Sequence, residues 1–283
     1  MSAKPSSAFV DPDWVLRQLP VISYFCENDG LYTMRWLNAG GGNDLGYDLQ
    51  DFVNNKHYFA ASAIHPDDLD VVDDFAERAL QGQRAILARY RLVHVEGRVL
   101  PTLVMARVVR DANDKALGFC GQVLNLADMA SLQGPSGVIT DHDAPRNHVE
   151  APRSTDPGVP TPDWMLRQVP TPAWVAEVKG QPTVVVASAQ VAPILGAATG
   201  AEDTMLPVHG QDVAHVGSLI QKAAAKPGNS AAARVRLVHA TGREVPVLLS
   251  CRFAAGPQGG RAVGILYDLT FARQLQGKPG LVA

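Results

Sequence analysis

The sequence predicts an α+β protein made of two similar domains. DPDWVLRQLP at residues 11–20 recurs as TPDWMLRQVP at 161–170, and RLVHVEGRVLP at 91–101 recurs as RLVHATGREVP at 236–246, in the same order. Within each copy, short β-like segments stand before and after a helical pattern. Two domains is also the count that a length of 283 residues favours.

Composition narrows the class of protein. Hydrophobic residues make up 46% of the chain and charged residues 19%, which is enough apolar material for folded domains. The net charge is −3 and no basic stripe is interleaved with aromatics, so nucleic-acid binding is disfavoured. The sequence also predicts no membrane span, no secretory signal and therefore a cytoplasmic protein. Three cysteines without CxxC spacing predict buried thiols and no disulfide framework.

The domain boundaries follow from the repeat and from composition. Residues 133–160 are rich in Pro, Gly, Asp and Ser and predict a flexible linker. The predicted organisation is an N-terminal tail at 1–10, a first domain at 11–132, the linker, a second domain at 161–275 and a C-terminal tail at 276–283.

Each copy opens with a short helix followed by two strands. Asp11 or Thr161 is a suitable N-cap, and the proline after it suits the first helical position. The alternating segments at 21–27 and 31–38 predict a hairpin turned at 28–30, and the segments at 172–178 and 182–188 predict its counterpart.

A helix and three further strands complete each copy. The helix begins at His65-Pro66-Asp67-Asp68 and extends to residue 82, where proline and acidic residues favour a helix start. His209-Gly210-Gln211-Asp212 repeats this start. The strands are expected at 85–94, 98–110 and 115–127, and again at 232–240, 243–255 and 260–270.

Both copies resemble the PAS sensor domain family, including its C-terminal PAC motif. The resemblance rests on Leu45-Gly46-Tyr47, His65 to Asp68, Tyr90-Arg91-Leu92 with Gly97, and Gly264 followed by Asp268-Leu269-Thr270. It implies a five-stranded antiparallel sheet in each domain, with helices packed on one face around a small pocket. It also implies a role for Asp268, Leu269 and Thr270 in passing a signal beyond the last strand.

The two copies depart from the family pattern in different places. The first closes with Asn125-Leu126-Ala127, which lacks the acidic residue. The second has HGQD in place of HPDD, and Leu195-Gly196-Ala197 in place of Leu-Gly-Tyr. The copies are therefore expected to have different roles.

Strand alternation selects candidate pocket residues in the first copy. Arg35, Arg89 and Arg91 mark the outer face, so alternation places the other face toward the helices. The candidates are Tyr32, Met34, Trp36, Tyr90 and Leu92. The matching positions of the second copy, Val184, Val186, Val235 and Leu237, are aliphatic, which favours a ligand pocket in the first copy. The alternative is that these residues only fill a core.

No cofactor is specified by a motif. A haem would need an axial ligand, for which unmatched His57 is the candidate, since His65 recurs as a helix-capping His209 and His94 recurs as His239 beside a turn. Non-covalent flavin stays open, with Trp36 as a wall, whereas the cysteine motif of flavin-adduct photosensors is absent. His142 and His148 with Asp141 and Asp143 lie in the linker and predict a surface cluster, not a metal site.

The apolar faces of the opening helices are candidate contact surfaces. Their residues are Trp14, Leu16, Leu19, Trp164 and Leu166, and in PAS domains such faces often form homodimers.

The expected function follows from the absence of catalytic motifs. The sequence contains no recognisable set of catalytic residues, so the expected protein is a non-enzymatic tandem PAS sensor. It would perceive a small-molecule or redox signal and contact a signalling protein such as a histidine kinase or another regulator. The alternatives are a ligand-free adaptor that dimerises and recruits partners, or the sensory half of a histidine kinase or cyclase.

Overall fold

The structure is a computed structural model of the chain. It describes residues 11–39, 45–82, 85–127, 129–134, 137–138, 160–177, 184–186, 191–196, 206–225, 230–256, 259–270, 272–275 and 280–282. The predicted linker cluster of His142 and His148 lies outside the described residues.

The chain forms two compact units. Unit A contains residues 21–170, 271–275 and 283, and unit B contains residues 1–20, 171–270 and 276–282. This division follows the expected two domains except at the opening helices and at residues 271–275, each of which belongs to the unit built mainly by the other repeat.

Unit A contains one antiparallel sheet, with helices both before and after its last three long strands. Its strands are β1 (Ile22–Glu27), β2 (Met34–Ala39), β3 (Ile86–Val93), β4 (Val99–Arg110), β5 (Ala116–Asn125) and β6 (Gly137–Val138). Its helices are η2 (Leu49–Asp51), α2 (Phe59–Ala63), η3 (Pro66–Asp68), α3 (Leu69–Gln81), η4 (Ala130–Leu132), α4 (Pro162–Gln168) and η6 (Arg273–Leu275).

Unit B repeats this arrangement. Its strands are β7 (Ala173–Glu177), β8 (Val184–Val186), β9 (Ser230–Val238), β10 (Glu244–Gly256), β11 (Gly259–Asp268) and β12 (Gly280–Val282). Its helices are α1 (Pro12–Gln18), α5 (Val191–Leu195), η5 (Gly210–Asp212) and α6 (Val213–Ala225).

The strand order is the same in both sheets. Unit A has the order β2-β1-β5-β4-β3-β6, and unit B, read from its other end, has β8-β7-β11-β10-β9-β12. All the pairs are antiparallel. The first and last long strands of each repeat, β1 with β5 and β7 with β11, therefore lie side by side inside the sheet.

Each sheet has one strand more than the five expected. The segments predicted as linker and C-terminal tail contribute β6, which pairs with β3, and β12, which pairs with β9. A strand at the edge of a sheet has backbone N–H and C=O groups free to pair, which is the physical reason that even two or three residues can add there.

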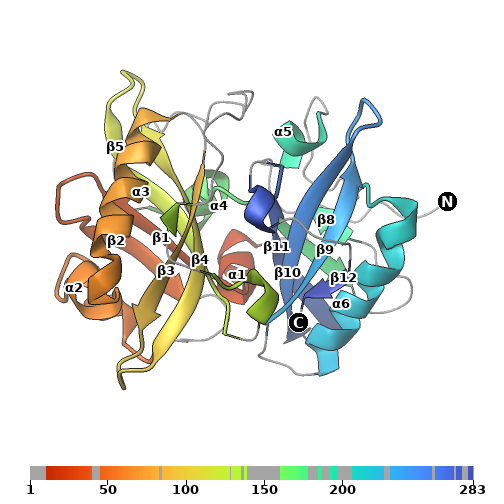
Figure 1. Cartoon of the computed structure of the whole chain (residues 1–283), viewed down its shortest axis with the longest axis horizontal. Coiled ribbons are helices and arrows are strands. Elements are labelled where there is room, and N and C mark those ends of the chain that lie inside the picture. The colour runs from red at the N-terminus through yellow and green to blue at the C-terminus, as the bar shows by residue number, and fades with distance from the viewer. Residues whose placement is uncertain are drawn as a thin grey trace. The chain divides into compact units, whose positions relative to one another are not determined.

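The long helix of each unit lies on one face of its sheet (Figure 1). Helix α3 packs on β3 and β4, and α6 packs on β9 and β10. In α3, Val72, Phe75, Ala76 and Ala79 recur at helical spacing and pack in the core of unit A. None of the helices among the described residues is both long and apolar enough to cross a membrane.

The opening helices begin as the sequence predicts. The side chain of Asp11 accepts a hydrogen bond from the Asp13 amide at 3.0 Å, and Thr161 Oγ1 accepts one from the Trp164 amide at 3.3 Å. Each helix has proline at its first position. Both N-cap predictions are therefore confirmed.

Helix α4 packs on unit A although it opens the second repeat. The Trp164 ring meets the Phe25 ring of β1 edge to face, with centroids 5.1 Å apart. The Arg107 guanidinium of β4 donates to the Arg167 carbonyl at 3.0 Å, which satisfies an acceptor at the end of the helix.

Helix α1 packs on unit B in the same manner. It lies against β11, where the Arg261 guanidinium stands 5.7 Å from the centroid of the Trp14 ring. The two repeats have thus exchanged their opening helices between the units.

Candidate ligand cavity in unit A

The core of unit A contains a partly open cavity of about 50 Å³ between the sheet and helices α2 and α3. The residues that line it are Tyr24, Cys26, Tyr32, Met34, Phe59, Ala60, Ile64, Val72, Phe75, Ala76, Tyr90 and Phe119. Pockets that hold drug-sized ligands usually have roughly 300–1,000 Å³. In this conformation the cavity therefore suits a molecule much smaller than haem or flavin.

The cavity wall is formed by side chains at strand spacing on β1 and at helical spacing on α3. Tyr24 and Cys26 are alternate residues of β1, so their side chains lie on the same face of the sheet. Val72, Phe75 and Ala76 lie at helical spacing on α3 and close the cavity from the other side. The site is therefore a gap between a strand face and a helix face.

The polar groups of the wall are neutral at physiological pH. Burial raises the pKa of the Tyr90 phenol and, together with smaller effects of Tyr90 and both nearby thiols, that of Tyr24. Burial also raises the pKa of the Cys26 thiol. None of the lining residues is Asp, Glu, Lys, Arg or His. The wall thus offers hydroxyl and thiol donors but no charge.

Three of the predicted pocket residues line the cavity, and three do not. Tyr32, Met34 and Tyr90 are in the wall. Leu92 is fully buried in the same core but outside the wall. His57 is exposed and is not in the wall, and its ring meets the Phe52 ring only at 6.5 Å between centroids, so the structure does not place it as a haem ligand.

Trp36 lies on the opposite face from the one that the sequence predicted. The pairing of β1 with β2 runs Tyr24 to Leu37, Phe25 to Trp36 and then Cys26 to Met34, which leaves Arg35 as an extra residue in a β-bulge. A bulge shifts the alternation by one residue. Trp36 consequently shares the outer face with Phe25, and Leu37 replaces it in the core.

Sequence reasoning missed several residues of the wall. These are Tyr24, Cys26, Phe59, Ala60, Ile64, Val72, Phe75, Ala76 and Phe119. The alternation of β1 and the apolar spacing of α3 were signals that could have found Tyr24, Cys26 and Phe75. Phe59 and Ala60 stand on the five-residue helix α2, for which the sequence has no comparable signal.

Unit B has different side chains at the corresponding positions. Tyr24 corresponds to Trp174, which is fully buried and donates from Nε1 to the Ile265 carbonyl at 3.0 Å. Val235 stands at the position of Tyr90, and Ile220 at the position of Ala76. Unit B therefore has no hydroxyl at the positions of Tyr24 and Tyr90, and the N–H group of Trp174 is already hydrogen-bonded.

An ion pair between a buried aspartate and a partly exposed arginine joins the helix start to the sheet in each unit. In unit A, Asp68 accepts from the Arg91 amide at 2.7 Å and from its guanidinium at 2.9 and 2.7 Å. The sequence assigned Asp68 to the helix dipole and Arg91 to solvent. Asp68 is instead buried, because its carboxylate is hydrogen-bonded by both the backbone and the side chain of Arg91, whose side chain remains partly exposed.

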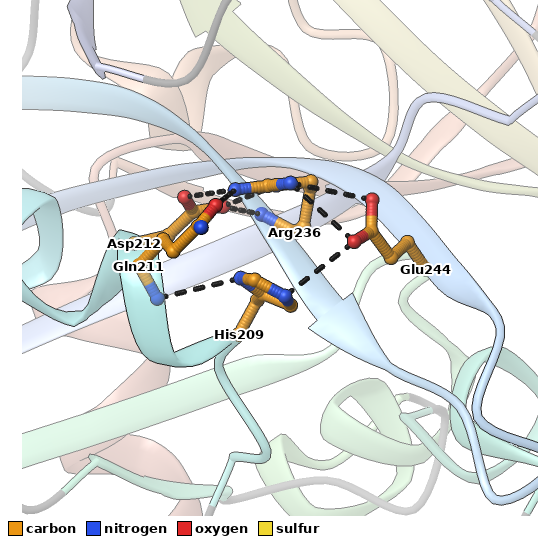
Figure 2. A network of polar contacts seen from close by, with 5 residues as sticks. All are labelled: His209, Gln211, Asp212, Arg236 and Glu244. Atoms are coloured by element: carbon orange, nitrogen blue, oxygen red, sulfur yellow. Dashed lines mark hydrogen bonds and ion pairs between the residues drawn. The ribbon is translucent and has the colours of Figure 1, made fainter.

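The same pair recurs in unit B with additional partners (Figure 2). Asp212 accepts from the Arg236 amide at 2.8 Å and from its guanidinium at 2.9 and 2.7 Å. The guanidinium also donates to Gln211 at 3.1 Å, and its other side faces Glu244 at 3.4 Å. Hydrogen bonding by Arg236 lowers the pKa of Asp212. His209 lies 3.4 Å from Glu244.

The repeated histidines have structural roles. His65 Nδ1 accepts from the Asp67 amide, and His209 Nδ1 accepts from the Gln211 amide, both at 3.3 Å, which confirms the predicted capping role. His94 bonds its own turn and packs on Gly46, where a Cβ atom would lie 2.5 Å from the ring. Gly46 also has a φ of 72°, so both its backbone conformation and the close approach of the His94 ring favour glycine at this position.

Arg89 points away from the cavity as predicted but is buried. The segment after η4 covers it, and a Cβ atom on Gly134 would lie 2.8 Å from its guanidinium. Burial lowers the pKa of Arg89. The outer face at this place is therefore covered by the chain and not solvated.

The closing strands end in equivalent turns. Asp268 accepts from the Thr270 amide at 2.8 Å, and Asn125 accepts from the Ala127 amide at 2.9 Å. Leu269 is buried. The turn of the first repeat thus keeps its geometry without the negative charge, and signal relay through Asp268, Leu269 and Thr270 stays a prediction.

The candidate dimerisation residues are largely used within the chain. Leu16, Leu19 and Leu166 are buried, and the rings of Trp14 and Trp164 are half-buried against β-strand residues. Among the described residues, no three His, Cys, Asp or Glu side chains are grouped to hold a metal ion.

Comparison with known proteins identifies the class of domain. Residues 36–123 match the family model of the PAS fold, and unit A therefore contains a PAS domain. No curated protein matches the chain.

The solved structures to which this chain is similar include the following three sensor proteins or domains. A PAS domain from Colwellia psychrerythraea is 14% identical, covers 41% of this chain and 94% of its own, and has a TM-score of 0.36. The N-terminal domain of a diguanylate cyclase with PAS/PAC sensor from Marinobacter aquaeolei is 18% identical, covers 38% and 95%, and has a TM-score of 0.33. An RNA-binding light-oxygen-voltage receptor is 13% identical, covers 90% and 97%, and has a TM-score of 0.32.

Proposed function

We propose that this chain is a non-enzymatic sensory protein in which the PAS domain of unit A binds a small molecule and the signal is passed on through protein contacts. The observation that carries the proposal is the cavity of about 50 Å³ in the core of unit A. Core packing in proteins is usually dense, and a gap lined by aromatic and sulfur-containing side chains forfeits contacts that a bound molecule would restore.

We infer that unit B is a second PAS-like domain, which makes the protein a tandem sensor. The common strand order, the repeated sequence blocks and the recurring Asp–Arg pair support this inference. The buried Trp174 with its hydrogen-bonded indole favours a filled core in unit B. Unit B would then serve protein contacts, for example with a histidine kinase or another cytoplasmic regulator.

The test is to identify what the purified full chain carries. An absorption spectrum is recorded first, and the protein is then denatured and the released small molecules are identified by mass spectrometry. We expect a small organic molecule at up to one equivalent per chain, without the absorption bands of haem or flavin, because both exceed the cavity.

A cavity-filling variant provides the matched control. Ala76→Ile introduces the residue that unit B has at the same position, Ile220, and should abolish binding while the protein stays folded. If the wild-type chain binds no small molecule, or if Ala76→Ile binds it equally well, the sensor proposal fails. The ligand-free adaptor, which the small cavity and the filled unit B would suit, then becomes the better account.

A further inference from the structure

The exposure of the wall residues locates the opening of the unit A cavity. Most of the lining residues are buried, whereas Tyr32, Ala60 and Val72 are half-buried. Ala60 stands on α2, Val72 stands on α3, and Tyr32 stands in the turn between β1 and β2. A molecule that enters the cavity from solvent therefore passes between these three residues.

The side chain of Tyr32 connects the strand turn to α3 at this opening. Its hydroxyl donates to Asp73 Oδ1 at 3.4 Å, and Asp73 is the exposed neighbour of Val72 on the helix. The Tyr32 ring also meets the Phe119 ring of β5 edge to face, with centroids 5.9 Å apart. Tyr32 thus borders the opening and contacts both of its sides, the sheet and the helix.

The backbone on each side of Tyr32 is held by hydrogen bonds. Tyr32 has a φ of 51°, which is unfavourable for a residue with a large side chain and persists only where the surroundings hold it. Asp29 Oδ1 accepts from the Leu31 amide at 3.2 Å and from the Thr33 amide at 3.1 Å. Asn55 Nδ2 donates to Thr33 Oγ1 at 2.7 Å. The turn therefore fixes the position from which the Tyr32 side chain extends.

The tip of the Tyr32 side chain is held weakly by comparison. A separation of 3.4 Å is long for a hydroxyl donor, whose hydrogen bonds usually measure roughly 2.5–3.0 Å. Asp73 is exposed, so water competes for its carboxylate. Side chains that are not enclosed change rotamer rapidly. The ring can therefore rotate away from the opening while the turn and the helix stay in place.

Unit B does not have this contact. The position of Asp73 in α3 corresponds to Gly217 in α6, which has no side chain to accept a hydrogen bond. The position of Ala76 corresponds to Ile220, which packs in the core of unit B. The acceptor for the tyrosine thus occurs in the unit that has the cavity.

We propose that Tyr32 is the gate of the unit A cavity and that its hydrogen bond to Asp73 holds the gate closed. The proposal rests on the sensor function above and concerns how the ligand of that site enters and leaves. The hydroxyl is directed to Asp73 and not to a bound molecule. Its removal should therefore change the rates of entry and exit by the same factor and leave Kd unchanged.

Xenon is the probe, because it binds in small apolar cavities without a hydrogen bond. Binding to the full chain is followed by NMR of methionine methyl groups, since Met34 lies in the cavity wall. Met165, which is buried in α4, is the internal reference. The shift of Met34 with xenon pressure gives Kd, and relaxation dispersion of the same methyl group at half saturation gives the exit rate. The entry rate follows from the two.

Two variants break the hydrogen bond from opposite sides. Tyr32→Phe keeps the ring without the hydroxyl, and Asp73→Ala removes the acceptor. We expect each to raise both rates about three- to tenfold, with Kd unchanged within about twofold, which is the factor that a single hydrogen bond supplies. The double variant should be no faster than either single variant, because both remove the same bond.

Two further variants are matched controls. Tyr58→Phe removes the hydroxyl of an exposed tyrosine outside the cavity wall. Asp70→Ala removes an exposed carboxylate one turn before Asp73 on α3. Both should leave the rates of xenon entry and exit at the wild-type values.

The outcomes separate the gate from the sensor function. If xenon shifts Met34 but Tyr32→Phe and Asp73→Ala exchange it at the wild-type rates, the gate is wrong and the cavity still binds small molecules. Faster exchange in Tyr32→Phe alone would also overturn the proposal, because the hydroxyl would then not act through Asp73. If xenon shifts Met34 in none of these proteins, the cavity admits no molecule, and both the gate and the sensor function are overturned.

Discussion

Asp68 is a buried carboxylate at the start of the long helix of unit A. Its side chain is 3% exposed and accepts three hydrogen bonds from Arg91, whose side chain is 37% exposed. We predict that Asp68→Asn destabilises the protein by about 1–2 kcal/mol, because the charge-assisted bonds are lost while solvent screens part of the effect. The free energy of unfolding from urea titration measures this change.

Asp70→Asn separates the ion pair from the helix dipole. Asp70 is exposed in the first turn of the same helix, so it has the dipole interaction but not the arginine. We expect it to change stability by less than about 0.5 kcal/mol. If both variants lost the same free energy of unfolding, the helix dipole would account for the contribution of Asp68, as the sequence suggested.

The corresponding pair in unit B predicts a pH dependence. Hydrogen bonding by Arg236 lowers the pKa of Asp212 in the folded state. Its stabilisation is therefore complete above the unfolded pKa of about 3.9 and is lost as the pH falls through the lower folded value. Urea titrations should show a constant stability difference between wild type and Asp212→Asn from pH 7 to about pH 5, shrinking at lower pH. A difference that persists at pH 2 would contradict this account.

Sequence patterns located single residues well where the strands are regular. Alternation placed Tyr90 and Met34 in the wall, and the repeat identified the capping role of His65. The same reasoning failed at Trp36, because the extra residue Arg35 reverses the alternation within β2. A bulge depends on pairing with a neighbouring strand, which a single strand's pattern does not contain.

At the scale of the element, the opening helices could be predicted but their packing partners could not. Their caps involve residues two or three positions apart and are visible in the sequence. Which sheet a helix covers depends on contacts between residues far apart in the chain, such as Phe25 with Trp164. Because the sequences of the two helices are nearly identical, they do not reveal whether each helix packs on the sheet of its own repeat or on that of the other repeat.

The exchange predicts that a tryptophan of the second repeat stabilises the first. Trp164→Ala removes the ring that packs on Phe25. We expect a loss of about 2–3 kcal/mol, below the usual cost for a fully buried ring because Trp164 is half-buried. Hydrogen exchange should accelerate in β1 of unit A, and peptides covering β11 of unit B should be unchanged.

Trp14→Ala is the reciprocal variant. Trp14 lies beside Arg261 of β11, so its removal should accelerate exchange in β11 and leave β1 protected. Each tryptophan serves as the control for the other. If Trp164→Ala affected β7, the strand that follows it in sequence, and not β1, the exchanged packing would be wrong.

At the scale of the whole molecule, the repeat made the architecture predictable, and the differences between the copies located the site. The order of strands and helices in both units follows the repeated blocks. The cavity occurs where the first copy has Tyr90 and Ala76 and the second has Val235 and Ile220. The sequence comparison identified this contrast on the strands, whereas the size of the cavity depends on packing between elements.

The bounds of the compact units differ from those of the sequence repeats, and this difference predicts which fragments of the chain fold on their own. A fragment of residues 21–170 contains the five long strands of unit A together with α4, whereas residues 11–132 contain the same strands with α1 in place of α4. We predict that the 21–170 fragment folds as a monomer with the higher urea midpoint, because α4 covers Phe25 and receives the Arg107 hydrogen bond.

The fragment cut at the repeat boundary should behave differently. Its α1 shares PDW and LRQ with α4, so two copies of residues 11–132 can each supply a helix to the other, and sedimentation should show a concentration-dependent dimer. Trp164→Ala in the 21–170 fragment tests whether α4 is the cause, since it should lower the midpoint without removing β6. A monomeric 11–132 fragment as stable as 21–170 would mean that unit A does not need the helix of the second repeat, and the exchange would then have no energetic role.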